Sequence, residues 1–186
     1  MKMNVEKIGD WEKAEKFFSD ISTNNFIGHT VRLLHRVGLL CVNWVVKAIQ
    51  NSTAGGKKFP PLHPFTASRR RGGQGSPLMD KGDLIGSVNY VVDSANLEAF
   101  VGVLKGKIKD GKDIVDIATI LHNGATIPVT KKMRHYLASQ GFYLKSSTTH
   151  LVIPPRPFLN EIVSRKGEIS ETLAKEQRKW IMSIIQ

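Results

Sequence analysis

The chain has 186 residues, one cysteine and a formal net charge of +11. This length can bury a sizeable core as one domain, and no apolar run approaches the ~20 residues that cross a bilayer. One cysteine excludes an intrachain disulfide and a metal site built from several cysteines, and the polar, acidic N-terminal residues do not predict a secretory signal. We therefore expect a single domain over residues 1–186, without a membrane, that folds in a reducing cytoplasm.

The net positive charge is concentrated in two stretches that contain no Asp or Glu, residues 21–79 and residues 117–160. The basic residues of the first stretch are Arg32, Arg36, Lys47, Lys57, Lys58, Arg69, Arg70 and Arg71, and those of the second are Lys131, Lys132, Arg134, Lys145 and Arg156. This segregation predicts a strongly positive field over part of the surface. Two interpretations stay open: contact with nucleic acid or an acidic protein, or a solvated basic face that only favours solubility.

Residues 10–22 and residues 26–51 have the spacing of two amphipathic helices. Asp10 is a candidate N-cap for the first helix, and Asn24 or Asn25 for the second. The apolar side of the second helix consists of Ile27, Val31, Leu34, Gly38, Cys41, Val45 and Ala48 or Ile49. Steps of three and four residues are typical of one buried face, so we interpret this stripe as core packing.

Residues 52–76 are rich in glycine and proline and contain the cluster Arg69, Arg70 and Arg71. Because these two residue types interrupt helices and strands, the stretch is predicted to be a long basic loop or extended arm. Loops of this length are usually functional or disordered. Its glycines do not form a phosphate-binding loop, because the Lys-Ser/Thr ending of that motif is absent.

The second half of the chain alternates short strands and helices. Strands are predicted over residues 84–93, 97–104, 142–145 and 150–153, with a further extended piece over 126–129. Helices are predicted over residues 114–121, 131–139, 159–164 and 168–185, with Gly124 and Gly141 ending the first two. Together these elements predict an α+β fold, in which a small, mostly antiparallel sheet packs against the long N-terminal-half helix and a C-terminal helix.

Residues 153–159 contain Pro154, Pro155 and Pro157. Each proline fixes its own φ, lacks a backbone N–H and favours an extended residue before it. The segment is therefore predicted to be a stiff elbow between a strand and the final helical region. Taken alone, such an elbow is most simply a rigid turn.

The sequence contains no recognisable catalytic constellation. Its six histidines are scattered, and none forms the spaced pair with Glu that is typical of zinc-dependent hydrolases. Asp80 and Asp83 are better interpreted as turn and cap residues than as an acid and base. We therefore expect no enzyme activity, no metal site and no cofactor.

Six motifs in one order resemble the bacteriophage virion-morphogenesis, or tail-completion, family. They are RLLH at residues 32–35, FPPL at 59–62, PLMDKGDL at 77–84, ILHNG at 120–124, PVTKKMR at 128–134 and IPPRPFL at 153–159. The resemblance covers roughly residues 27–162. It departs from the family pattern at Lys81, where threonine is usual, and at Asn123, where an acidic residue and an aromatic are more typical.

The resemblance implies a structural protein, not an enzyme, in the virion of a tailed phage. Copies would form an oligomeric ring at the head–tail junction, or neck, and allow heads and tails to join after assembly in the host cytoplasm. The implied partners are further copies of the chain, neighbouring neck or connector proteins, and tail-terminator or tail-tube proteins. Genomic DNA would pass through the lumen of the ring.

The basic residues are the candidate interface or DNA-facing positions. They are Lys57, Lys58, Arg69, Arg70, Arg71, Lys131, Lys132, Arg134 and Arg156. They would touch phosphates without reading sequence or dock on acidic neighbours. The alternative function is a free, basic nucleic-acid-binding protein without sequence specificity, although no aromatic residues are interleaved with the basic ones as stacking platforms.

Overall fold

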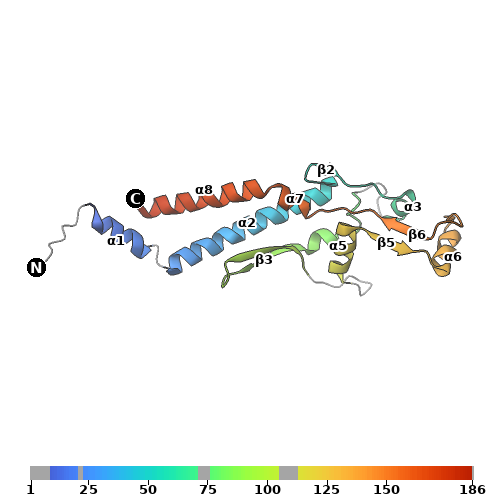
Figure 1. Cartoon of the computed structure of the whole chain (residues 1–186), viewed down its shortest axis with the longest axis horizontal. Coiled ribbons are helices and arrows are strands. Elements are labelled where there is room, and N and C mark those ends of the chain that lie inside the picture. The colour runs from blue at the N-terminus through green and yellow to red at the C-terminus, as the bar shows by residue number, and fades with distance from the viewer. Residues whose placement is uncertain (1–8, 21–22, 71–75, 105–112, 186) are drawn as a thin grey trace, which may run out of the picture. The chain divides into compact units, whose positions relative to one another are not determined.

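The computed structural model describes residues 9–20, 23–70, 76–104 and 113–185. Its helices are α1 (Trp11–Asp20), α2 (Thr23–Asn51), α3 (Pro64–Ala67), α4 (Asp83–Ser87), α5 (Ile114–Asn123), α6 (Lys131–Ser139), α7 (Asn160–Ser164) and α8 (Lys166–Ile185). Its strands are β1 (Thr53–Ala54), β2 (Lys57–Lys58), β3 (Val88–Asp93), β4 (Glu98–Val103), β5 (Ala125–Pro128) and β6 (His150–Ile153). The predicted α+β class is confirmed (Figure 1). The described strands form three two-stranded sheets, β1–β2, β3–β4 and β5–β6.

The contacts of the chain define two compact units. Unit 1 comprises Met1–Leu40, Val91–Phe100 and Lys166–Gln186, and unit 2 comprises Cys41–Tyr90 and Val101–Arg165. The boundary falls inside helix α2 and inside the β3–β4 hairpin, so no linker in the sequence marks it. The single domain expected over residues 1–186 stays a prediction.

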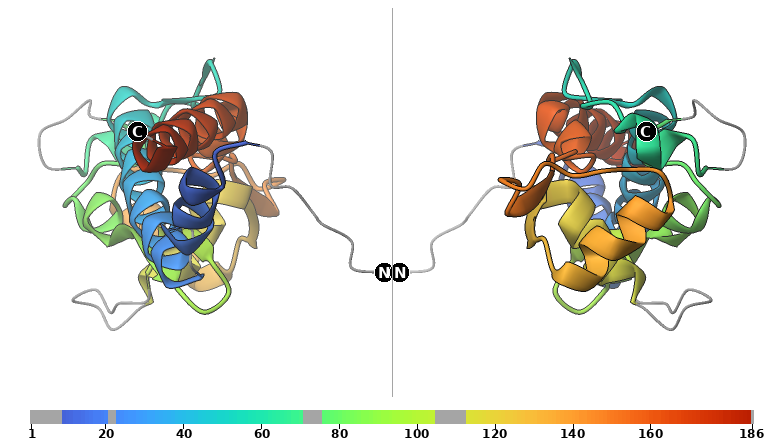
Figure 2. Two further views of the ribbon diagram at one scale, coloured as in Figure 1. Left: turned by 90° about the vertical axis from the view of Figure 1, so that its left-hand side faces the viewer. Right: turned by 90° about the vertical axis from the view of Figure 1, so that its right-hand side faces the viewer.

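Unit 1 is built from helices α1 and α8, the first part of α2 and the tip of the β3–β4 hairpin. The Asp10 carboxylate accepts a hydrogen bond from the backbone N–H of Lys13 at 3.3 Å, as predicted for the cap of α1. Helix α2 begins at Thr23, before the two positions predicted to cap it, Asn24 and Asn25. Helix α8 runs antiparallel to the first part of α2 (Figures 1 and 2), where Arg36 forms an ion pair with Glu176.

A partly buried histidine lies between these two helices. His29 of α2 stacks on Trp180 of α8 with ring centroids 4.6 Å apart, and its Nε2 atom has no hydrogen-bond partner in the described structure. Burial lowers the pKa of His29, the charges of Arg32 and Arg36 lower it further, and Glu176 opposes them. The folded unit therefore resists protonation of this ring.

We expect unit 1 to lose stability as the pH falls. The folded-state pKa of His29 lies below the ordinary histidine value of about 6.5, so its stabilising contribution is complete above that value and is lost as the pH falls through the folded-state pKa. The urea midpoint, followed by Trp180 fluorescence, should decrease between about pH 7 and pH 5. His29→Gln should flatten this decrease, and His135→Gln on exposed α6 should not. Equal slopes for the wild type and His29→Gln would contradict the assignment.

The core of unit 2 forms around the last part of α2. Its buried side chains come from several elements: Val45, Ala48, Ile49, Ala54, Phe59, Leu78, Leu84, Val88, Ala118 and Phe158. Val45, Ile49 and Phe158 have no exposed surface. The predicted apolar stripe is thus confirmed for the second half of α2, where Cys41 is also buried and burial raises the pKa of its thiol.

The β5–β6 ribbon and its two flanking helices follow the predicted boundaries closely. The strands pair antiparallel, with Ala125 opposite Ile153 and Pro128 opposite His150. Helix α6 spans the predicted residues 131–139 and is capped by Thr130, whose hydroxyl accepts from the Met133 N–H at 3.1 Å. Gly124 ends α5 with a φ of +77°.

Three predicted segments differ from the structure. Residues 84–87 belong to α4 because the Ser87 hydroxyl closes a helical turn onto the Leu84 carbonyl, so that the strand begins at Val88. Residues 142–145 form no strand. The long loop at 52–76 contains the β1–β2 hairpin and α3, and it contributes Ala54 and Phe59 to the core. Its role as an arm stays a prediction.

Candidate interaction surface

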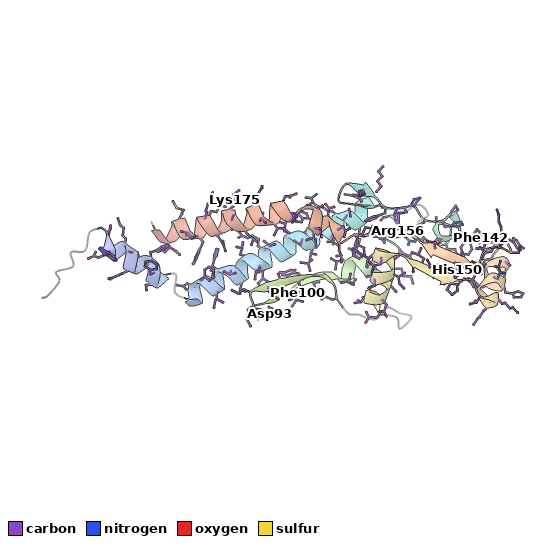
Figure 3. All side chains as sticks on the ribbon, in the orientation of Figure 1. Asp93, Phe100, Phe142, His150, Arg156 and Lys175 are labelled. Atoms are coloured by element: carbon purple, nitrogen blue, oxygen red, sulfur yellow. The ribbon has the colours of Figure 1, made fainter. Side chains whose placement is uncertain are left out.

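The proline-rich elbow places a buried arginine at the centre of unit 2. The side chain of Arg156 is 3% exposed and lies in the segment between β6 and α7 (Figure 3). Its Nε donates to the carbonyl oxygen of Pro60 at 3.1 Å and its Nη2 to that of Pro61 at 3.2 Å. Its backbone N–H donates to the Leu121 carbonyl at 2.8 Å. One residue therefore joins three segments that are distant in the sequence.

No carboxylate among the described residues pairs with Arg156. Its charge is stabilised by the carbonyl dipoles of Pro60 and Pro61. Backbone carbonyl groups are the available acceptors because the neighbouring sequence contains no acidic residue. Burial lowers the pKa of Arg156, and the positive charge of Arg70 lowers it further. A guanidinium nevertheless stays protonated at neutral pH, so this is a buried cation with neutral partners.

Gly124 brings the end of α5 against the same elbow. An added Cβ would lie 2.7 Å from the carbonyl oxygen of Ile153 and 3.0 Å from the nitrogen of Pro155. Real side chains do not approach backbone atoms this closely, so glycine is required here for space as well as for its positive φ. Beside it, His122 contacts the buried ring of Phe158 edge-on, with centroids 5.4 Å apart.

Two further arginines bind loop carbonyl groups. Arg70 donates to the carbonyl oxygens of Ser76, Pro77 and Met79 at 2.8–2.9 Å and so holds the turn that precedes α4. Arg134 donates to the carbonyl oxygen of Thr148 at 2.6 Å and of Lys145 at 2.9 Å.

This second interaction explains the missing strand at 142–145. Carbonyl groups that a strand would pair with a neighbouring strand are oriented toward the Arg134 guanidinium instead. The loop after α6 is therefore organised around one side chain.

Arg69 forms a different kind of contact. Its guanidinium lies over the rings of Phe65 and Tyr136, 4.8 and 5.6 Å from their centroids, donates to the Tyr136 hydroxyl at 2.6 Å and also hydrogen-bonds Gln140. Such stacking suits the planar guanidinium and connects α3 with α6. Arg71 lies outside the described residues.

The predicted basic positions thus divide into two groups. Arg156 is buried, and Arg70 and Arg134 use their donors within the chain, so these side chains shape the loops and do not present free charges to a partner. Lys57 and Lys58 in β2, and Lys131 and Lys132 at the start of α6, are exposed. The two lysine pairs lie on different elements, β2 and α6. Arg69 is also exposed, but its guanidinium is stacked on two rings, so among the described candidate positions the four lysines present charge to solvent without a partner in the described structure.

Sequence reasoning missed the role of the arginines. A signal was present, because two long stretches without acids cannot provide carboxylate partners for a buried arginine. Loops rich in proline and glycine have many carbonyl groups outside regular structure, and these are natural acceptors for a guanidinium fork. Which arginine binds which loop depends on contacts over as many as 96 positions, and sequence spacing does not reveal those.

Clusters of metal-ligating side chains and long apolar helices are both absent from the part of the chain that the structure describes. They contain no group of three or more His, Cys, Asp or Glu side chains that could hold a metal ion. Among the helices that the structure describes, none combines the length and apolarity needed to cross a bilayer. Comparisons with protein-family models, with curated proteins and with solved structures found no match to this chain.

Proposed function

We propose that the protein is a structural component of a tailed-phage virion, where copies form an oligomeric ring at the head–tail junction and allow heads and tails to join. The observation that carries this proposal is the mutual contact of its motifs. The segments 59–62, 120–124 and 153–159, each part of the resemblance to the tail-completion family, meet at Arg156 and Gly124. Motifs that build one core are a stronger signal than the same motifs scattered over a fold.

The architecture of unit 2 is consistent with a scaffolding role. Arginine–carbonyl clusters hold three irregular segments in fixed positions, which pre-organises loop surfaces for contact with neighbours. A closed ring needs heterologous interfaces, in which different patches of one subunit meet. The proposed neighbours are further copies, neck or connector proteins, and tail-terminator or tail-tube proteins, with genomic DNA passing through the lumen. Assembly would take place in the host cytoplasm.

A second candidate function is nucleic-acid binding without sequence specificity. It is favoured by the exposed pairs Lys57–Lys58 and Lys131–Lys132, since solvated lysines supply the salt-dependent attraction to phosphates. It is weakened by the internal use of Arg70, Arg134 and Arg156.

The two functions are separated by one complementation experiment. Tails are prepared from a phage whose copy of this gene carries a nonsense mutation, and are mixed with wild-type heads and the purified full-length protein. We expect the protein to associate with tails, measured by sedimentation, and to restore infectious particles.

Binding of random duplex DNA by the isolated protein is measured in parallel at low and raised salt. Salt-sensitive DNA binding without any effect on tails would overturn the structural proposal and favour the second function. Full infectivity of the mutant phage without added protein would also overturn it.

A further inference from the structure

A groove of about 470 Å³ opens on unit 2 beside the elbow. One wall is the β1–β2 hairpin with Lys57 and Lys58, and the opposite side is formed by Pro155, Pro157 and helix α7. Ala54 and Phe59, at its base, belong to the core. Val163 of α7 lines the groove and is 66% exposed, so its apolar side chain is accessible beside the two prolines.

The walls of this groove are fixed in place. The Gly55 N–H donates to the Glu161 carboxylate at 2.7 Å, which attaches the hairpin to α7. The Arg156 hydrogen bond to the Pro60 carbonyl attaches the same chain segment to the elbow. Prolines add stiffness because their φ angles are fixed. A rigid groove loses little conformational entropy when a ligand binds.

The charge of the groove is positive and uncompensated. Neither Lys57 nor Lys58 forms an ion pair within the described part of the chain, and both side chains are exposed. The nearby acid is Glu161, but one of its oxygens accepts from Gly55 and the other from Arg165 at 2.7 Å. An incoming carboxylate would therefore meet two solvated ammonium groups beside an apolar surface.

We propose that this groove binds an extended segment of an acidic partner protein, in which Asp or Glu side chains pair with Lys57 and Lys58 and apolar side chains lie against Val163 and the prolines. The rigid apolar wall offers contact area at little entropic cost, and the lysines select the sign of the ligand's charge. A nucleic acid fits less well, because Phe59 is buried and provides no face on which bases could stack.

This inference deepens the proposed function by naming a docking surface, and it rests on that function for the source of the segment. The test uses the full chain and no virion, so the two can fail independently. The probes are fluorescein-labelled short peptides of alternating Glu and Leu, alternating Glu and Ser, and alternating Lys and Leu, and a single-stranded thymidine oligonucleotide. Binding is measured by fluorescence polarisation and mapped by amide chemical-shift changes.

We expect the Glu–Leu peptide to bind most tightly and to shift the amides of Gly55, Asn160 and Val163. Charge reversal at the groove, Lys57→Glu with Lys58→Glu, should weaken binding about tenfold or more. The matched pair Lys131→Glu with Lys132→Glu, which changes the net charge equally, should weaken it less than about twofold. Val163→Ser should weaken binding of the Glu–Leu peptide but not binding of the Glu–Ser peptide.

Several outcomes would overturn the proposal. Equal losses for the two lysine pairs would show that only net charge matters. Equal affinity for the Glu–Leu and Glu–Ser peptides would remove the role of the apolar wall. Tighter binding of the oligonucleotide, lost in the Lys57/Lys58 variant, would assign the groove to nucleic acid. A folded protein that binds none of the probes would show that the groove has no such ligand.

Discussion

Replacing Arg156 with alanine is expected to lower the free energy of unfolding of unit 2 by about 3 kcal/mol. The substitution leaves the carbonyl groups of Pro60 and Pro61 without their donor. Losing a hydrogen bond to a charged donor costs about 1.5–3 kcal/mol, and water offsets part of this cost at Pro61, which is exposed. It also leaves a cavity where a 3%-exposed side chain was packed. These costs are offset in part because the variant no longer buries a cation without an anionic partner.

The measurement is urea unfolding followed by the fluorescence of Trp44, which is buried in unit 2. Trp11 and Trp180 are replaced by phenylalanine so that Trp44 alone reports. Arg156→Lys keeps the charge but not the two-donor fork, and should lose about half as much. Lys131→Ala, at an exposed position, should change stability by less than about 0.5 kcal/mol. A loss for Arg156→Ala as small as that of the control would show that the elbow does not depend on the arginine.

The secondary structure was predictable wherever local signals determine it. Helix α6 needs only Thr130 as a cap, a helical pattern and Gly141 beyond its end, and all are visible in the sequence. The same holds for α1 with Asp10 and for the final helix. The β6 strand is bounded by the prolines that follow it. These elements were found because the information lies within a few residues.

The remaining structure depends on distant contacts. The segment 142–145 has the composition of a strand, but the Arg134 guanidinium binds its carbonyl groups. Residues 52–76 have the composition of a free loop, but Ala54 and Phe59 fill the core and Arg156 binds the two prolines that follow. In both cases an arginine side chain fixes the conformation of a loop by binding its carbonyl groups. The sequence shows that the arginine is charged, but it does not show which loop the side chain reaches.

The candidate surface was predictable in the same limited way. The basic stretches pointed to arginines and lysines together, because charge is what composition shows. Burial separates them: a planar guanidinium can satisfy several carbonyl groups from inside the fold, whereas a lysine ammonium is strongly hydrated and stays at the surface. Of the predicted basic positions, Lys57 and Lys58 are the two that line the groove.

Gly124→Ala is expected to destabilise unit 2 by about 2–4 kcal/mol. Two effects combine at this position. Its φ of +77° is unfavourable for any L-residue with a side chain, and the new methyl group would lie 2.7 Å from the Ile153 carbonyl oxygen, which is fixed by the β5–β6 pairing. The Trp44 unfolding measurement applies here as well.

Gly141→Ala separates these effects. Gly141 has nearly the same φ, +78°, but no atom lies within 4 Å of its added Cβ. Its loss should therefore reflect backbone strain alone, about 1–2 kcal/mol, and the excess at Gly124 measures the close approach to the elbow. Pro155 lies against Gly124 and also lines the groove beside Lys57 and Lys58. Gly124→Ala should therefore also weaken binding of the Glu–Leu peptide, whereas Gly141→Ala should not. Equal stability losses and unchanged peptide binding would show that the elbow yields to the methyl group and does not set the shape of the groove.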